Sequence, residues 1–531
     1  MVSKPFSKIM QTMKYTRRDP KDYPFLWGKY YLSWERAREH FLVMGATGSG
    51  KTVLLRRLMQ TVLPQIGTAA APGRRALIYD SKKDMLAVLV GMGVPLERIA
   101  IMNPFDARSV AWDIAADVQS PQEATELANL LIPKEQESQP FFSNTARSIL
   151  RGVIEVFMST SPGAWTLRHI LLACEDHGVL RRLLESHPPT KWLLGLMDKE
   201  QTWLDIKSSL DSHLYRFRFI AAAWHAAYEK GRKISIKQWL EGEKVIVLGN
   251  DDNARSELDI INRLFFDKMS QLINSQTPSE AKSKQTWLFL DEVREAGKLN
   301  TLHSLLLRAR SKNCAVVLGF QDVVGMESVY GEKEARELLG CPATLAILHL
   351  NPTAHAARKW ASEVIDQDEH REKSDGSSMK GAVSDMTTST QSRWVVRAVF
   401  NPIEFYLLGR AGSERGMQGI FVVEEHLHKV MDEKRPFPEE RVTLSNDELF
   451  KDKETGLKPE NTGVEDYMPR PVRDLVLEPW QEKGNDSRNL PDIAAVFCEA
   501  ARSSRAALAE LGNGFGNRNM NAEKQSQWRR T

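Results

Sequence analysis

The strongest chemical signal in the sequence is a glycine-rich stretch that ends in a lysine and a threonine. Residues 45–52 read G-A-T-G-S-G-K-T, a full match to the pattern G-x-x-x-x-G-K-[ST]. Glycines let a backbone curl so that successive N–H groups point at phosphate oxygens, and the N-terminus of a following helix adds a positive dipole end. The stretch predicts a phosphate-binding loop made of Gly45, Ala46, Thr47, Gly48, Ser49, Gly50, Lys51 and Thr52.

Two side chains of this loop have separate expected roles. Lys51 would neutralise the β- and γ-phosphates of a nucleotide, and Thr52 would offer its hydroxyl to Mg²⁺, which prefers oxygen ligands and keeps several waters. The apolar run 41–44 precedes the loop and a helix-like stretch, 53–62, follows it, which is the strand–loop–helix setting that the motif requires. We therefore expect ATP and Mg²⁺ as cofactors. A glycine-rich turn before a helix is the alternative without chemistry.

A second candidate element is an apolar run that ends in two carboxylates. Residues 286–292 read T-W-L-F-L-D-E. Asp291 would hold Mg²⁺ through its water shell, and Glu292 would polarise the attacking water as a general base. An adjacent glutamate suits hydrolysis rather than transfer to a bound acceptor. An acidic pair at the N-terminus of a following helix is the structural alternative.

A polar amide follows the next apolar run in the chain. Residues 316–321 read V-V-L-G-F-Q, so Gln321 would stand at the carboxyl end of a strand. Ligands of open α/β sheets bind at that edge. Gln321 is therefore a candidate sensor of the γ-phosphate, and a polar residue at the start of a loop is the alternative.

These side chains need a sheet that brings strand ends together. Short runs rich in β-branched residues recur along the chain, mostly separated by helix-like stretches, which predicts a mainly parallel, doubly wound sheet. The runs are Phe41–Met44, Ala76–Tyr79, Ile99–Met102, Val245–Leu248, Trp287–Leu290, Ala315–Leu318 and Thr344–Leu348. The interval between the third and fourth runs has helical patterns only, and we interpret it as an inserted all-α subdomain.

The remaining segments are polar or charged. Residues 366–393 are rich in Ser, Thr, Asp and Lys, which favours a long mobile loop. Residues 512–531 are a tract of Gly, Asn, Gln and Arg that cannot bury a core. The expected domains are 1–40, a basic N-terminal segment with lead-in strands; 41–113, the first part of the nucleotide-binding domain; 114–232, the all-α insertion; 233–430, its second part; and 431–531, a charged C-terminal extension that is disordered at its end.

Bulk composition narrows the cellular setting more than the function. The net charge of +3 does not by itself establish a nucleic-acid partner. The four cysteines lie far apart without a C-x-x-C pair, which favours a reducing cytosol over a zinc site or a disulfide framework. No run of 18 apolar residues is present, so we expect a cytoplasmic protein. The first 18 residues combine apolar positions at helical spacing with basic ones, and a solvated tail is weighed against peripheral membrane contact.

Seven stretches, in this order and spacing, resemble the type IV coupling proteins of bacterial conjugation, the TraD/TrwB-like branch of the FtsK/HerA-type DNA-pumping ATPases. The N-P-F-D-x-R-x-x-x-W stretch at 103–112 and the block from 291 to 335 are more specific than the phosphate loop. The stretches are 45–52, 103–112, 288–292, 308–310, 319–321, 329–335 and 405–412. The long helical insertion also stands where this family has its all-α domain.

This resemblance implies a fold and a mode of action. The fold class would be α/β, a doubly wound P-loop NTPase with a RecA-like core, an inserted all-α subdomain and a partly disordered C-terminal tail. The family forms rings, so a homo-hexamer is expected, in which Arg310 reaches a neighbour's γ-phosphate as an arginine finger and Lys333 lies at the same interface. A solvated helix end is the alternative for Arg310. The family carries transmembrane helices before its nucleotide domain, and about 40 residues precede Gly45 here, so membrane docking would need a partner at the inner membrane.

Three functions compete at this stage. The first is an ATP-driven translocase of DNA, expected to be single-stranded, in a conjugative or mobile-element transfer system. The second is an ATP-dependent adaptor that recruits a relaxase or a secretion-channel component without moving DNA. The third, a small-molecule kinase, lacks a recognisable acceptor or lid segment. Lys207, Arg216 and Arg218 could line a DNA channel, although a charged helix face is usually only solvated.

Overall fold

The structure is a computed structural model, and it divides into two compact units. It describes residues 24–28, 30–133, 141–251, 254–365, 367–379, 386–398, 400–412, 416–422, 441–444 and 463–479. Unit 1 comprises residues 1–81, 91–94 and 274–462, and unit 2 comprises residues 82–90, 95–273 and 463–531. The first 18 residues, for which a solvated tail was weighed against membrane contact, and the polar tract at 512–531 lie outside the described residues.

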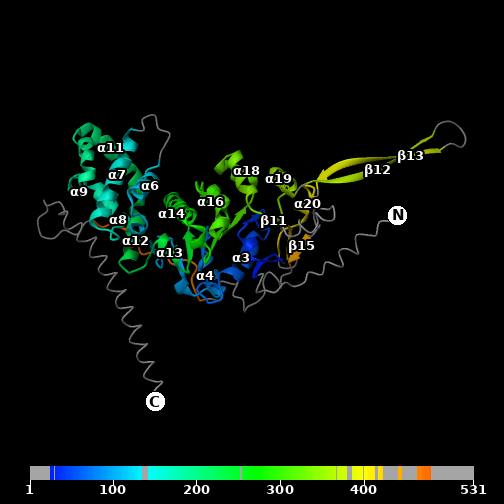
Figure 1. The fold of residues 1–531 in the computed structure, drawn as a ribbon, viewed down its shortest axis with the longest axis horizontal. Helices are drawn as coiled ribbons and strands as arrows, with labels where there is room; N and C mark the ends of the chain where they lie inside the picture. Colours follow the sequence, from blue (N-terminus) through cyan, green and yellow to red (C-terminus); the bar gives the residue numbers. More distant parts are fainter. Residues whose placement is uncertain are drawn as a thin grey trace, which may run out of the picture. The chain divides into compact units, whose positions relative to one another are not determined.

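A mainly parallel sheet forms the centre of unit 1 (Figure 1). Its strands follow the order β15-β14-β11-β3-β10-β9-β4. Strands β3, β4, β9, β10 and β11 are parallel to one another, β14 pairs antiparallel with β11, and β15 pairs antiparallel with β14. Strands covered on both faces read as continuous apolar runs, which is why the sequence signal was clear. The bounds are β3 Phe41–Met44, β4 Arg74–Asp80, β9 Gln285–Leu290, β10 Cys314–Phe320, β11 Thr344–Leu348, β14 Met417–Val422 and β15 Arg441–Leu444.

The helices of unit 1 connect these strands. Helix α3 shows why they pack: its buried residues Leu54, Leu55, Leu58, Met59 and Val62 recur every three or four positions and form one apolar face. The helices are α2 Trp34–Ala37, α3 Lys51–Val62, α15 Pro278–Ala281, α16 Leu302–Ala309, α17 Val323–Tyr330, α18 Glu332–Gly340, α19 His355–Ile365 and α20 Glu404–Leu407.

Two short lead-in strands add an aromatic cluster to this core. Strands β1 (Phe25–Trp27) and β2 (Tyr30–Leu32) pair antiparallel. Phe25 lies 5.0 Å from Trp287 between ring centroids, and Trp27 lies 4.8 Å from Phe41. Edge-on and tilted ring pairs at such distances add to the stabilisation from burial. The segment before the phosphate loop is therefore part of the core.

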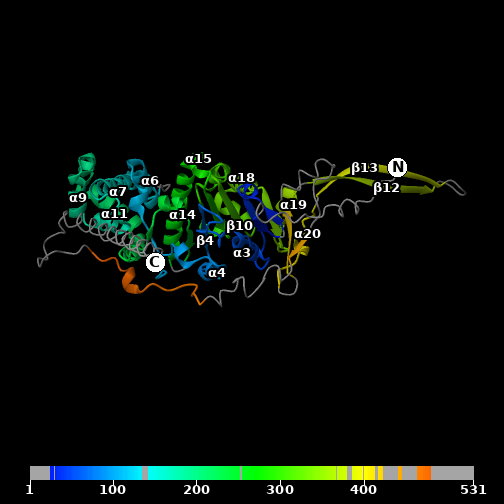
Figure 2. The same ribbon diagram turned by 60° about the horizontal axis from the view of Figure 1, so that its bottom comes forward.

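The mobile loop expected at 366–393 is wrong for residues 367–379 and 386–393, because they belong to two paired strands. Strands β12 (Gln367–Met379) and β13 (Met386–Ala398) pair antiparallel from Gln367↔Ala398 to Met379↔Met386, and they run side by side in both views (Figure 1 and Figure 2). A two-stranded ladder is held by backbone hydrogen bonds, and Thr and Val favour extended backbone, so a low apolar content does not exclude it.

Unit 2 contains two short parallel strand pairs and a group of helices. Strand β5 (Ile99–Ile101) pairs with β8 (Val245–Gly249), and β6 (Ala111–Trp112) pairs with β7 (Lys233–Ile234). The helices are α4 Met85–Gly91, α5 Ile114–Asp117, α6 Pro121–Leu131, α7 Phe141–Thr160, α8 Leu167–Glu175, α9 His177–Ser186, α10 Leu194–Met197, α11 Glu200–Leu214, α12 Arg218–Tyr228, α13 Ile236–Glu241 and α14 Arg255–Ser275, with short 3₁₀ turns at 96–98, 188–193, 215–217 and 472–475.

The helical interval at 114–232 begins and ends at the same place in unit 2, the strand pair β6–β7. The pairing of β6 with β7 sets its two ends side by side, and the buried carboxylate of Asp117 fixes the junction. Asp117 accepts hydrogen bonds from Trp112 Nε1 at 2.7 Å and from the backbone N of Ile236 at 2.7 Å. Between these ends the described residues, 114–133 and 141–232, form helices and no strand. The domain boundaries expected from the sequence stay predictions.

No helix within the described ranges combines the length and the apolar character needed to cross a membrane.

Candidate functional site

The phosphate loop connects β3 to α3 and has the backbone shape that its glycines allow. Gly48 and Gly50 adopt positive φ angles of 77° and 97°, which strain any residue with a Cβ. Gly50 is the N-cap of α3, and it makes no side-chain capping hydrogen bond. Behind the loop, the backbone N of Ala46 donates to His349 O at 2.9 Å. The result is an anchored loop that opens onto the N-terminus of a 12-residue helix.

Lys51 lies against the carboxylate that the sequence predicts as the general base. The distance from Lys51 Nζ to Glu292 Oε2 is 2.6 Å, and the two side chains are only 10% and 13% exposed. Gln321 Nε2 also donates to Glu292 Oε2 at 3.3 Å, and Thr47 Oγ1 donates to Gln321 Oε1 at 3.4 Å. The phosphate loop with the first turn of α3 and the carboxyl ends of β9 and β10 therefore bring these four side chains together.

Thr52 and Asp291 form a second pair beside the first. Thr52 Oγ1 donates to Asp291 Oδ2 at 2.9 Å. Gly319 on β10 leaves room for the backbone of Asp291, because a Cβ at that position would lie 2.2 Å from the backbone O of Asp291. A hydroxyl and a carboxylate are the oxygen donors that Mg²⁺ prefers, so the residues present fit a magnesium ion bound with a nucleotide.

Arg310 and Lys333 are not joined to this cluster by any hydrogen bond or ion pair among the described residues. Arg310 Nη2 lies 2.8 Å from Glu39 Oε1, and its side chain is 62% exposed. Lys333 is exposed in the first turn of α18. The neighbouring His40 is buried, and its burial lowers the pKa of the imidazole to about 4. The roles expected for Arg310 and Lys333 stay predictions.

The basic residues suggested for DNA contact lie on helices of unit 2, where each has a local partner. Lys207 Nζ on α11 lies 2.5 Å from Asp211 Oδ2, and Arg218 on α12 pairs with Glu175. Arg216 Nε donates to the backbone O of His213 at 3.1 Å. The stretch 202–228 is two helices joined by a 3₁₀ turn at 215–217.

Sequence reasoning missed a segment that touches the phosphate loop from another part of unit 1. Ala411 N donates to Gly48 O at 3.0 Å, and a Cβ at Gly50 would lie 2.6 Å from Met417 Sδ. Arg410 passes the same loop, with its Cδ 3.9 Å from the position of a Cβ on Gly48. Residues 405–412 contribute to the resemblance to the coupling proteins, but the sequence gives them no role at the nucleotide site. The glycines of the G-R-A-G sequence at 409–412 were the one sign of a close backbone contact there.

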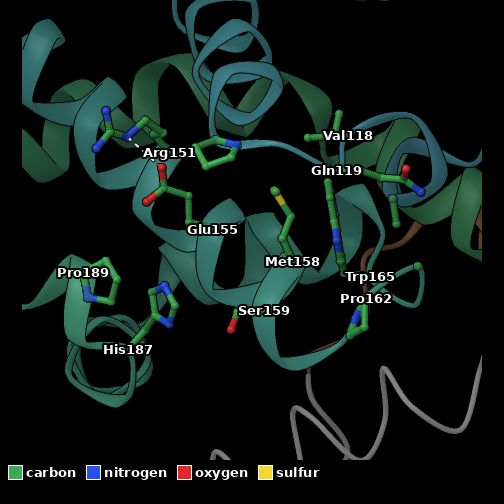
Figure 3. A pocket seen from close by; sticks show the side chains of 13 residues that line it. Val118, Gln119, Arg151, Glu155, Met158, Ser159, Pro162, Trp165, His187 and Pro189 are labelled. Atoms are coloured by element: carbon green, nitrogen blue, oxygen red, sulfur yellow. Dashed lines mark ion pairs between the residues drawn. The ribbon is translucent and has the colours of Figure 1, made fainter.

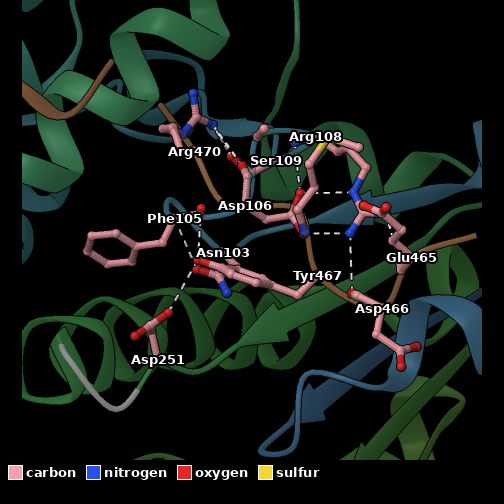
Figure 4. A network of polar contacts seen from close by, with 12 residues as sticks. Asn103, Phe105, Asp106, Arg108, Ser109, Asp251, Glu465, Asp466, Tyr467 and Arg470 are labelled. Atoms are coloured by element: carbon pink, nitrogen blue, oxygen red, sulfur yellow. Dashed lines mark hydrogen bonds and ion pairs between the residues drawn. The ribbon is translucent and has the colours of Figure 1, made fainter. Parts of the chain in front are cut away.

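The N-P-F-D-x-R stretch at the end of β5 is held by a C-terminal segment of unit 2 (Figure 4). Arg470 donates to Pro104 O at 2.6 Å, to Asp106 O at 3.0 Å and to Ser109 Oγ at 2.6 Å. Arg108 pairs with Asp106 at 2.7 Å between Nη2 and Oδ2, and it also donates to backbone oxygens of residues 465 and 466. This stretch therefore has a structural task in the described chain.

A surface pocket of about 640 Å³ lies in the helical part of unit 2 (Figure 3). Met158, Pro162 and Trp165 line it together with the ion pair of Arg151 and Glu155, in which Nε and Oε1 are 3.3 Å apart. None of the residues that the sequence predicts for nucleotide chemistry lines this pocket.

The parallel sheet with its phosphate loop and acidic strand end defines the chain as having a P-loop NTPase fold, as expected. The family model for the type IV secretion-system coupling protein DNA-binding domain matches residues 25–412, and the chain belongs to this family. The predicted resemblance is thereby confirmed.

Known relatives agree with this assignment. Coupling protein TraD of Escherichia coli (strain K12) is 23% identical over 361 residues, which are 67% of this chain and 47% of TraD, so the chain spans about half the length of that relative. The unbound conjugative coupling protein TrwBdeltaN70 superposes with a TM-score of 0.58 at 19% identity, covering 82% of this chain and 90% of TrwBdeltaN70. TrwB in complex with ADP and Mg²⁺ gives 0.57 at 22% identity, covering 80% and 90%.

Proposed function

We propose that this chain is an ATP-driven DNA translocase of a conjugative or mobile-element transfer system, acting as a ring on DNA. The observation that carries the proposal is the convergence of two pairs, Lys51 with Glu292 and Thr52 with Asp291, on the N-terminus of α3. The family's domain is described as DNA-binding, and TrwB has been solved with ADP and Mg²⁺, which supports ATP and Mg²⁺ as cofactors here. The proposal includes the division into a nucleotide-binding domain at 41–113 and 233–430, an all-α insertion at 114–232, an N-terminal segment at 1–40 and a C-terminal extension at 431–531.

Within this proposal the residues of the site divide the work of hydrolysis. Lys51 would leave Glu292 and bind the β- and γ-phosphates, because a phosphate cluster offers more negative charge than one carboxylate. Glu292 would then be free to accept a proton from the attacking water, with Gln321 beside it to contact the γ-phosphate. Thr52 and Asp291 would hold Mg²⁺, which supplies charge neutralisation at the phosphate oxygens.

The DNA and ring parts of the proposal rest on the family. We propose a homo-hexamer on single-stranded DNA, with a relaxase or a secretion-channel component as further partners. Arg310 would exchange Glu39 of its own chain for the γ-phosphate bound by a neighbour, and the exposure of Arg310 leaves it accessible for this exchange. Lys333 would lie at the same interface.

ATPase assays with the full chain test the enzyme and its DNA dependence. We expect turnover that rises with single-stranded DNA and less with duplex, at low and moderate salt. Lys51→Ala should abolish nucleotide binding or turnover, whereas Glu292→Gln should bind ATP without hydrolysing it. Wild-type turnover in Lys51→Ala would contradict the assignment of the nucleotide site. Turnover that does not change when DNA is added would favour the ATP-dependent adaptor over the translocase.

A mixing experiment tests the ring. Arg310→Ala should keep nucleotide affinity but lose turnover by about 10³-fold or more. Mixed with Lys51→Ala, it should recover activity, because some interfaces would combine an intact Lys51 with a neighbour's intact Arg310. Absence of recovery, together with turnover per chain that is independent of protein concentration, would contradict the ring.

A further inference from the structure

Residues 409–412, the segment before the gap at 413–415, contact the phosphate loop within unit 1, and Met417 at the start of β14 adds to these contacts, which are three in number. The first is the hydrogen bond from Ala411 N to Gly48 O, at 3.0 Å. The second is the packing of Met417 and Ala411 against Gly50, where an added Cβ would lie 2.6 Å from Met417 Sδ and 3.2 Å from Ala411 Cβ. The third is the stem of Arg410 beside Gly48. These residues therefore hold the loop at Gly48 and Gly50.

Arg410 brings a guanidinium to this place without a carboxylate to neutralise it among the described residues. Its hydrogen bond there is a long one, 3.5 Å from Nη2 to Asn351 Oδ1. Asn351 follows β11, two residues after the carbonyl of His349 that anchors Ala46. Arg410 is exposed, so its head can turn while Ala411 keeps its backbone on the loop.

Negative charge exceeds positive charge at the nucleotide site, which favours a second cation there. In the cluster, Lys51 is one positive charge against the two carboxylates of Asp291 and Glu292. Magnesium triphosphate is itself an anion, and Arg310 of the same chain pairs with Glu39 and is proposed to serve the site of a neighbour. A guanidinium is the side chain best matched to phosphate oxygens, since its planar fork donates two parallel hydrogen bonds.

We propose that Arg410 binds the terminal phosphates of the nucleotide held by the phosphate loop of its own chain, as a second cation beside Lys51. This inference rests on the proposed nucleotide site and adds a ligand to it. The task of Ala411 and Met417 is to position Arg410, because they fix the segment on glycines 48 and 50. Arg410 is thus a ligand in cis, distinct from the finger in trans proposed for Arg310.

Calorimetric titration of the full chain with ATP, ADP and AMP, each with Mg²⁺, tests the assignment. For Arg410→Ala we expect the Kd for ATP to rise about tenfold or more, as for the loss of charge-assisted hydrogen bonds, and the Kd for AMP to change less than about twofold. Arg410→Lys should recover part of the loss, because it restores the charge without the fork. Lys359→Ala is the matched control: Lys359 lies on α19 of the same unit with its side chain 76% exposed.

The outcomes separate this inference from the proposed function. If Arg410→Ala binds ATP as the wild type does while Lys51→Ala has lost it, Arg410 is not a ligand and the nucleotide site stands. An equal loss for ATP and AMP would also overturn the assignment, because the residue would then support the loop or the base. If Lys51→Ala binds all three nucleotides normally, the nucleotide site itself falls. Thermal unfolding of each variant establishes that it is folded.

Discussion

Replacement of Arg470 by alanine should release the C-terminal segment of unit 2 from the loop that follows β5. The Arg470 side chain is fully buried, and it donates to two carbonyls, of Pro104 and Asp106, and to the hydroxyl of Ser109 (Figure 4). Burial lowers the pKa of Arg470, but a guanidinium stays protonated in proteins. All three hydrogen bonds are therefore charge-assisted.

The magnitude follows from the acceptors left behind. Each buried group that loses its partner costs about 1–3 kcal/mol, and removal of one member of a buried charged network costs about 3–5 kcal/mol. Water can enter next to an alanine and satisfy part of the loss. We therefore expect the free energy of opening of this segment to fall by about 3 kcal/mol, which corresponds to amide exchange faster by about 100-fold.

Hydrogen exchange followed by mass spectrometry measures this directly on peptides that cover residues 99–112 and 463–479. Arg473→Ala is the matched control, because Arg473 stands three residues away with its side chain 85% exposed, and its loss should stay within about 0.5 kcal/mol. Equal exchange in the two variants would refute the view that Arg470 holds the segment in place.

Two further predictions concern single buried positions. Burial lowers the pKa of His169 to about 3, so the unfolded chain binds more protons between about pH 3 and 6.5, and stability falls as the pH drops through that range. His169→Gln keeps a capping partner for Thr166 but removes the titrating imidazole. Between pH 7 and pH 5, the free energy of unfolding measured by urea titration should therefore fall by about 2 kcal/mol less in the variant than in the wild type. An equal fall in the two proteins would contradict this prediction. Gly319→Ala should lower the melting temperature and weaken magnesium-dependent ATP binding, because its Cβ would lie 2.2 Å from Asp291 O. Gly340→Ala, with nothing within 4 Å of the added Cβ, should do neither, and equal behaviour of the two variants would count against the clash.

The paired strands β12 and β13 show where reasoning from hydrophobic patterns fails. The strands of the core were predicted because burial on both faces demands apolar residues in sequence, and all seven runs are strands in the structure. A two-stranded ladder is held by backbone hydrogen bonds and makes no such demand, so the low apolar content of residues 367–379 and 386–393 gave no sign of these strands. The same limit applies to α11 and α12, where the helical pattern continues through a 3₁₀ turn at 215–217 and gives no sign of the break.

The sequence by itself determined three local features: the glycine-rich loop between a strand and a helix, the strand that ends just before Asp291 and Glu292, and the place of Gln321 at the end of the next strand. Each of these features depends on residues within a few positions of one another. Only the tertiary structure decided that Lys51 meets Glu292, that Arg310 meets Glu39, and that Ala411 holds Gly48. Contacts between residues hundreds of positions apart depend on how the strands are ordered and how the chain returns. No local spacing encodes that order, and each such contact forms only when the whole unit folds around it.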